Sequence, residues 1–132
     1  SYIATKVVKE IARKSTSFIS KEVLIIGFTF KENCPDFRNT KVAVLVSELR
    51  DFGCVVDIYD PVCDVEAVFS EYDLGIESVI DRSKSYAAIV IAVPHTDVVL
   101  EHYDWIREQA DNGTVVYDLK GVMGREVSCA RV

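Results

Sequence analysis

The run of apolar residues from Val23 to Gly27 constrains the fold of this chain more than any other feature of its sequence. It is bounded by charged residues and has the length of one strand. A strand that is apolar on both faces must be covered on both, as in a parallel sheet. A polar loop follows, then a helix expected over 40–52 with Gly53 as its stop signal, and a second strand over 54–59. Strand, loop, helix and strand in this order predict a βαβ unit.

The rest of the chain continues this alternation. From apolar periodicity and turn residues we expect helices over 1–14, 65–72 and 97–109, and strands over 87–93 and 114–118. Residues 76–79 fit a short strand or a plain connection, and the tail from Leu119 is expected to be irregular. The expected apolar face of the 40–52 helix consists of Val42, Leu45, Val46 and Leu49. The pattern predicts an α/β fold with a doubly wound, mainly parallel sheet in a Rossmann-like three-layer sandwich.

Length, composition and charge limit the classes of function. The chain has 132 residues, which fits one domain, and its 49% hydrophobic content is enough for a core. The net charge of −6 argues against nucleic-acid binding, which depends on Lys and Arg neutralising phosphates, but it allows binding of a single nucleotide. No apolar run approaches the roughly 18 residues that span a bilayer, and no secretory signal is visible. We therefore expect a cytoplasmic protein without a membrane segment.

The cysteines form no CxxC pair and have no histidine at ligand spacing; they are Cys34, Cys54, Cys63 and Cys129. This spacing indicates reduced thiols in a cytoplasmic protein and no metal site. Cys34 alone lies in a polar, motif-like loop, where a small loop residue is a better interpretation than a catalytic nucleophile. Of the two histidines, His95 is expected in a loop and His102 on a helix surface.

In a sheet of this kind ligands bind outside the carboxyl ends of the strands. The informative loops are therefore those that follow Gly27, Tyr59, Val93 and Tyr117. The loop after Gly27 lacks the GxGxxG pattern, so its backbone cannot closely wrap a dinucleotide pyrophosphate. Asp60 takes the place of a ribose-binding acid, but it lies about thirty residues past Gly27, against a usual spacing of roughly twenty. A turn-forming aspartate before Pro61 explains it at least as well.

The same loop carries a cation near each end, Lys31 and Arg38, with Asp36 between them. Lys31 follows the buried strand, at the expected ligand edge. Arg38 lies near the start of the next helix, where the helix dipole disfavours a cation unless an anion accompanies it. Asp36 or a bound phosphate would serve. The residues alone leave two interpretations open, a ligand site and a surface ion pair worth about 0–1 kcal/mol.

The loop is part of a longer motif, GFTFKENCPDFRNTKV over residues 27–42. This stretch closely resembles the signature that opens the C-terminal domain of the UDP-glucose/GDP-mannose dehydrogenase family. In that signature an F-K pair is followed by D-x-R and a small hydroxyl residue. Phe30-Lys31, Asp36 to Arg38 and Thr40 occupy those positions, and the variant is most similar to the branch that oxidises UDP-N-acetylhexosamines. Residues 59–61 and 115–120 also match, so the resemblance covers nearly the whole chain.

The resemblance implies roles for four residues. The F-K pair of the family contacts the UDP-sugar, which implies substrate binding by Phe30 and Lys31. The Arg of D-x-R reaches the NAD bound to the N-terminal domain, across the cleft, which implies cofactor binding by Arg38. A basic residue two positions past the Asp that ends the last strand lies near the substrate, which implies Lys120. Many members have Arg there, and Lys cannot make the bidentate contact of Arg.

The resemblance also implies what the chain lacks. The nucleophilic Cys, the catalytic Lys and Asn, and the Gly-rich loop of the family lie in N-terminal and central parts that this sequence does not contain, so no catalytic residue is expected here. The whole reaction oxidises the sugar C6 alcohol to a carboxylate with two NAD, in a full-length homodimer, for surface polysaccharide synthesis. Residues 1–16 would be the helical tail of the linking region, and 17–132 the UDP-sugar-binding domain, inactive when isolated.

Two other interpretations remain. One is a stand-alone Rossmann-like module that binds a nucleotide or CoA; a GxGxxG domain upstream of Ser1 would decide against it. The helix that starts at Ser1 without a cap fits a chain cut from a longer protein. The other interpretation is a receiver-like signalling domain, which needs clustered acids after the first strand and a phospho-acceptor Asp after the third. Residues 27–29 and 93–95 offer neither.

Overall fold

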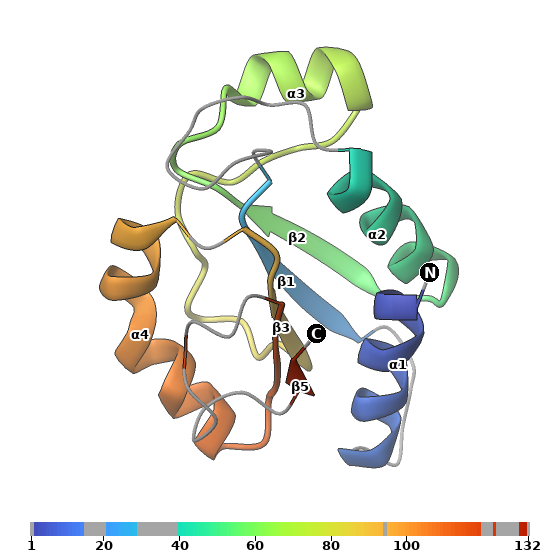
Figure 1. Cartoon of the computed structure of the whole chain (residues 1–132), viewed down its shortest axis with the longest axis vertical. Coiled ribbons are helices and arrows are strands. Elements are labelled where there is room, and N and C mark those ends of the chain that lie inside the picture. Colours follow the sequence, from blue (N-terminus) through green and yellow to red (C-terminus); the bar gives the residue numbers. More distant parts are fainter. Residues whose placement is uncertain are drawn as a thin grey trace.

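A computed structural model of the chain describes residues 2–14, 21–28, 40–93, 95–119, 123 and 130–131. Helices and strands alternate along most of it (Figure 1). The helices are α1 (Tyr2–Lys14), α2 (Thr40–Asp51), α3 (Val65–Tyr72) and α4 (Thr96–Asp111). The strands are β1 (Glu22–Ile26), β2 (Val55–Tyr59), β3 (Ala88–Ile91), β4 (Val115–Asp118) and β5 (Ala130–Arg131). Each helix and strand predicted from the sequence is present, with bounds within two residues of those expected.

The five strands form one parallel sheet in the order β2-β1-β3-β4-β5. Ile26 at the end of β1 lies opposite Tyr59 on β2 and Ile91 on β3, and Ile91 lies opposite Asp118 on β4. The carboxyl ends of these four strands therefore meet at one edge of the sheet. This arrangement confirms that the four strand ends share one edge, where the sequence predicts that a ligand binds.

One segment, β5, differs from the sequence-based expectation. For another, residues 76–79, the structure decides between the two alternatives that the sequence left open. β5 pairs with the end of β4 and replaces part of the irregular tail expected after Leu119. Nothing in its two residues predicts a strand, because the pairing depends on a neighbour in space. Residues 76–79 form a connection rather than a strand, with one bridge between Glu77 and Tyr59.

The side chains of the sheet point alternately into two apolar cores. One core is built by the sheet with α1, α2 and α3, and the other by the sheet with α4 (Figure 1). Val23 and Ile25 belong to the first core, and Leu24 and Ile26 to the second. The predicted face of α2 is buried in the first core through Val42, Leu45, Val46 and Leu49. Helices on both faces confirm the doubly wound, three-layer α/β fold.

The connection between α3 and β3 passes round the β2 edge of the sheet. Ile76 belongs to the core on the α2 side, whereas Ile80 and Tyr86 belong to the core on the α4 side. The Tyr86 hydroxyl donates to an oxygen of Asp57 on β2 at 2.7 Å, and Lys84 Nζ lies 2.9 Å from the same oxygen. The connection therefore covers part of the sheet that a helix would otherwise cover.

His102 of α4 is buried, not exposed on the helix surface, and the expectation from the sequence is wrong at this residue. Arg82 of the connection donates to Nδ1 of His102 at 2.7 Å and lies over the Trp105 ring. Nε2 of His102 is 3.1 Å from the Tyr59 hydroxyl and 2.7 Å from Glu101 Oε2. Burial lowers the pKa of His102, with Glu101 opposing that shift and Arg82 adding to it. The histidine thus fastens the connection to α4 and β2 in its neutral form.

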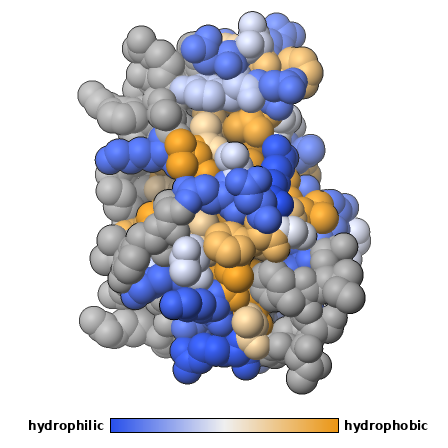
Figure 2. Space-filling view, turned by 90° about the vertical axis from the view of Figure 1, so that its right-hand side faces the viewer, coloured by the Kyte–Doolittle hydropathy of each residue, from blue (hydrophilic) through white to orange (hydrophobic). Residues whose placement is uncertain are grey.

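On the side of the molecule that carries α1 and α2, hydrophobic side chains reach the surface between hydrophilic ones (Figure 2). Val44 on α2 and Phe52 just past its end are examples of exposed large apolar side chains. Among the described residues, no helix is both long and apolar enough to cross a membrane.

Candidate functional site

The helices that follow β1 and β3 lie on opposite faces of the sheet. β1 lies between β2 and β3 in the sheet, α2 follows β1 on one face, and α4 follows β3 on the other. Connections that diverge in this way open a crevice at the carboxyl ends of the two strands, which is where open α/β sheets bind ligands. The geometry therefore places the candidate site at the ends of β1 and β3.

Gly27 brings these two strand ends together. Its φ is +94°, and a Cβ built on it would lie 2.3 Å from the carbonyl oxygen of Val93. Only glycine fits here, because a side chain would meet backbone that cannot move aside and would also require a disfavoured left-handed conformation. The backbone N–H of Gly27 donates to the carbonyl of Tyr59 at 2.8 Å, which joins β2 to the same point.

Asp60, the residue after β2, is the polar centre of this edge. Its carboxylate is buried, and Oδ2 accepts the backbone N–H of Phe28 at 2.8 Å and lies 3.2 Å from Nε2 of His95. Its Oδ1 accepts the backbone N–H groups of Val62 at 2.9 Å and Cys63 at 3.2 Å. One side chain therefore links the loops that follow β1, β2 and β3.

These contacts decide between the two interpretations of Asp60. Both carboxylate oxygens are engaged by protein donors and the residue is 1% exposed, so no oxygen is presented to a ribose. The turn-forming role before Pro61 is correct, and it is extended by the contacts to Phe28 and His95. The sequence signal that was available is an Asp directly after a buried strand. The partners that give it a wider role are remote in the chain.

Phe28 is anchored by its side chain as well as by its N–H group. Its ring is fully buried and meets the ring of Tyr72 on α3 edge-on, with 5.5 Å between centroids. The chain is thus held firmly up to Phe28, at the point where the motif loop begins.

His95 lies directly before α4 and is 1% exposed. Its expected place in a loop is correct, but its burial was not predicted. Since a carboxylate can only accept, Nε2 of His95 donates to Asp60. The backbone carbonyl of His95 accepts from Val99 at 3.0 Å and starts the first turn of the helix. His95 therefore ties the start of α4 to the end of β2.

A second buried acid, Asp118, lies at the end of β4. Its Oδ2 accepts the backbone N–H of Met123 at 2.7 Å, and its Oδ1 is buried without a hydrogen-bond partner among the described residues. The Met123 carbonyl accepts the Tyr103 hydroxyl at 3.4 Å, and the Leu119 N–H donates to Ile91 at 3.2 Å. Both flanks of the segment that contains Lys120 are therefore tied to the protein core.

The four residues assigned from the resemblance lie outside the described residues; they are Phe30, Lys31, Arg38 and Lys120. Cys34 and Asp36 also lie outside them. The structure does describe the residues that flank these positions, Phe28 and Thr40 on one loop and Leu119 and Met123 on the other. Phe28 lies just past β1 and Leu119 just past β4, Thr40 begins α2, and Met123 donates to Asp118 at the end of β4.

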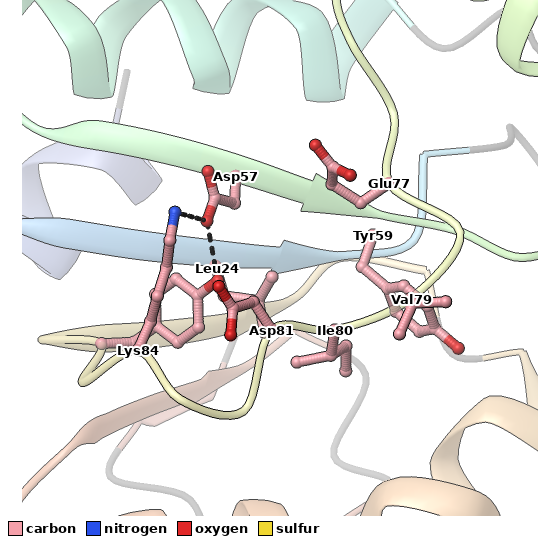
Figure 3. A pocket seen from close by; sticks show the side chains of 9 residues that line it. Leu24, Asp57, Tyr59, Glu77, Val79, Ile80, Asp81 and Lys84 are labelled. Carbon is pink, nitrogen blue, oxygen red and sulfur yellow. Dashed lines mark hydrogen bonds and ion pairs between the residues drawn. The ribbon is translucent and has the colours of Figure 1, made fainter.

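A polar pocket of about 140 Å³ lies on the α4 side of β2, under the connection between α3 and β3 (Figure 3). Asp57 and Lys84 point toward one another inside it, and Figure 3 shows the contact between them. Glu77 and Asp81 also line the pocket. Asp57 is already paired with Lys84 and Tyr86. We therefore interpret this pocket as structural, because these contacts hold the connection between α3 and β3 against the sheet.

The described cysteines offer no nucleophile. Cys54 and Cys63 are buried and free, and burial, with Asp60 and Asp64 nearby, raises the pKa of Cys63 to about 12. The thiolate is therefore strongly disfavoured, and the thiolate is the reactive form. Within the described part of the chain, no three His, Cys, Asp or Glu side chains gather in a way that could hold a metal ion.

Comparison with known families finds a match to the UDP binding domain of the UDP-glucose/GDP-mannose dehydrogenase family over residues 24–125. Among curated proteins, UDP-N-acetyl-D-glucosamine 6-dehydrogenase of Salmonella typhi is 39% identical over 132 residues, which is 100% of this chain and 31% of that protein. Protein CapL of Staphylococcus aureus is 35% identical over 95% of this chain and 29% of its own length. The chain thus spans about a third of the length of these relatives.

Solved structures share the fold. UDP-D-ManNAc dehydrogenase from Pyrococcus horikoshii aligns with a TM-score of 0.70 at 18% identity, over 98% of this chain and 29% of that one. GDP-mannose dehydrogenase from Pseudomonas aeruginosa aligns with a TM-score of 0.61 at 20% identity, over 94% of this chain and 30% of that one. At this level of identity the likeness supports the architecture only.

Proposed function

This chain belongs to the UDP-glucose/GDP-mannose dehydrogenase family, and we propose that it is the UDP-sugar-binding domain of an NAD-dependent nucleotide-sugar 6-dehydrogenase. The observation that carries the proposal is the match of residues 24–125 to the UDP binding domain of that family. The matched range runs from within β1 to past the end of β4 and therefore includes the carboxyl ends of these four strands.

The proposed reaction converts a UDP-hexose or UDP-N-acetylhexosamine into the uronic acid and consumes two NAD. Relatives from two bacteria are named UDP-N-acetyl-D-glucosamine 6-dehydrogenase, at 39% and 35% identity, which favours an N-acetylated substrate. A role in surface polysaccharide synthesis in the cytoplasm completes the proposal.

Within this domain we assign substrate binding to Phe30, Lys31 and Lys120. A lysine ammonium offers three donors and no acceptor, which suits phosphate oxygens and sugar hydroxyls. The support from the structure is indirect: the two segments that carry these residues begin at anchored positions, Phe28 past the end of β1 and Leu119 past the end of β4.

The described residues at the end of β1 do not fit a complete NAD site. Gly27 is the only glycine between residues 22 and 52, and its close approach is taken up by Val93. A dinucleotide pyrophosphate needs glycines that let it approach the backbone. The proposal therefore places NAD mainly on an N-terminal domain of the full-length protein. Arg38 is the residue that the 132-residue chain contributes to NAD binding.

The proposal divides the chain into two parts. Residues 1–16 are the helical tail of a linking region, and residues 17–132 are the UDP-sugar-binding domain. α1 nevertheless packs into the core shared with α2 and the sheet, through Ala4, Val7 and Ile11. In the proposal this packing joins the linking helix to the domain, and the full-length enzyme is a homodimer in which other domains supply the chemistry. The alternative is a stand-alone Rossmann-like module that binds a nucleotide.

The test uses the full-length product of the gene that encodes this chain, beside the 132-residue chain itself. We expect the full-length product to reduce NAD in the presence of UDP-N-acetylglucosamine, UDP-N-acetylmannosamine or UDP-glucose, and the 132-residue chain to produce no NADH with any of them. Binding of UDP without NADH formation by the full-length product supports the stand-alone module. NADH formation by the 132-residue chain contradicts the proposed division of labour.

A further inference from the structure

The two oxygens of Asp60 serve different parts of the molecule. Oδ1 accepts the N–H groups of Val62 and Cys63 and thereby stabilises the turn that follows β2. Oδ2 accepts the N–H of Phe28 and the Nε2–H of His95, which belong to the loops after β1 and β3. The turn needs only the first oxygen, so the second has a role beyond the turn.

The contact to Phe28 lies at the start of the motif loop. Phe30 and Lys31 follow Phe28 by two and three residues, and each step between Cα atoms is about 3.8 Å. A rotation of the Phe28 peptide plane would change the direction in which the chain leaves the sheet. The Phe28 ring is held against Tyr72, but a ring contact alone does not set the orientation of the preceding peptide.

We propose that Asp60 is a positioning residue for UDP-sugar binding, which acts by fixing the Phe28 peptide, the last described position before Phe30 and Lys31. The inference rests on the proposed function, and it extends that function to a residue that does not touch the ligand. His95 supports the arrangement by holding Oδ2 of Asp60 toward the end of β1.

Asp60→Asn separates this role from the role in the turn. The amide oxygen can keep accepting from Val62 and Cys63, which places the NH₂ group opposite the Phe28 N–H. Two donors then face each other, and Phe28 loses its acceptor. We expect the KM for the UDP-sugar of the full-length enzyme to rise about tenfold, the equivalent of about 1.4 kcal/mol. The KM for NAD should stay within about twofold.

The matched control is Asp57→Asn. Asp57 lies on β2, three residues before Asp60, and also holds two side-chain partners, Tyr86 and Lys84, but these belong to the connection between α3 and β3. Loss of these contacts should lower stability without changing the KM for the UDP-sugar. If a loss of stability alone raised the KM, the two variants would behave alike, and the inference would be overturned.

A second measurement reads the Phe28 peptide directly. In ¹⁵N-labelled 132-residue chain, hydrogen exchange of the Phe28 amide should be at least about tenfold faster in Asp60→Asn than in the wild type and unchanged in Asp57→Asn, because an amide that has lost its acceptor exchanges more readily. Should Asp60→Asn fail to fold, His95→Leu takes its place, with an expected rise in KM of about threefold, within the range of one lost hydrogen bond.

The outcomes are distinct. An unchanged KM in the Asp60 variant, or in His95→Leu if that variant is used, overturns the positioning role and leaves the proposed function intact. If the wild-type product forms no NADH, the proposed function fails. The exchange measurement is independent of activity: equal exchange of the Phe28 amide in wild type and Asp60→Asn overturns the positioning role.

Discussion

Nε2 of His95 lies 3.2 Å from Oδ2 of Asp60, and both residues are 1% exposed. Asp60 follows β2 and His95 follows β3, the two strands that flank β1 in the sheet. Their contact therefore spans the end of β1 and encloses the N–H of Phe28, which donates to the same oxygen. The end of β1, where the motif loop begins, is held from both sides by buried polar groups.

Gly27→Ala should destabilise the 132-residue chain by about 2–5 kcal/mol, because the left-handed conformation costs roughly 1–2 kcal/mol and overpacking adds roughly 1–3 kcal/mol. Gly53→Ala is the control: Gly53 has nearly the same φ, +92°, but a Cβ there would meet nothing within 4 Å. It should cost only about 1–2 kcal/mol. Urea denaturation of the two variants gives both values, and equal losses would contradict the close approach to Val93.

His102 should make the stability of the domain fall in mild acid. Burial lowers the pKa of His102 below its usual value of 6.5, so the unfolded chain takes up its proton at a higher pH than the folded chain. The free energy of unfolding therefore decreases as pH falls below 6.5, by at most about 1.4 kcal/mol per pH unit for this group. In His102→Gln this part of the decrease should disappear. Denaturation at several pH values from 5 to 8 gives the free energy of unfolding of the two proteins. If that free energy falls equally with pH in both, the assignment is refuted.

Cys63 should resist alkylation in the folded chain. Burial raises its pKa to about 12, which leaves almost no thiolate at pH 8. After iodoacetamide treatment, mass mapping should find Cys63 unmodified in native protein and modified in urea. Equal labelling of Cys63 in both states would show that the thiol is accessible.

The fold could be predicted further than the site. Residues 23–27 and the apolar face of α2 carry their structural meaning in local periodicity, and both are confirmed. His102 was misplaced because its neighbours Arg82 and Tyr59 come from other elements and create a buried polar cluster that helical periodicity does not show. Polar residues of this kind are decided by tertiary partners.

Asp60 shows the same limit at the candidate site. Its position after a buried strand was visible in the sequence, but a ribose ligand and a turn former share that position. The choice depends on whether the carboxylate oxygens face solvent, and the contacts with Phe28 and His95 show that they do not. The roles of Phe30, Lys31, Arg38 and Lys120 come from family resemblance and stay predictions.

Arg38→Ala in the full-length enzyme should raise the KM for NAD by about tenfold or more, since a lost charge-assisted contact costs about 1.5–3 kcal/mol. The KM for the UDP-sugar should change little. Arg50→Ala, at an exposed position on α2, is the control and should alter neither. Steady-state kinetics with each substrate varied in turn make the test. A large rise for the UDP-sugar with an unchanged value for NAD would reverse the assignment.

The most direct test of the account is the affinity of the full-length protein for a UDP-sugar with and without the Lys31 ammonium, measured by calorimetric titration. Loss of a charge-assisted hydrogen bond costs about 1.5–3 kcal/mol. Lys31→Ala should therefore weaken binding roughly ten- to a hundredfold. Lys41→Ala, an exposed lysine of α2, should leave the dissociation constant unchanged. Equal dissociation constants for wild type and Lys31→Ala would remove Lys31 from the site and contradict the account.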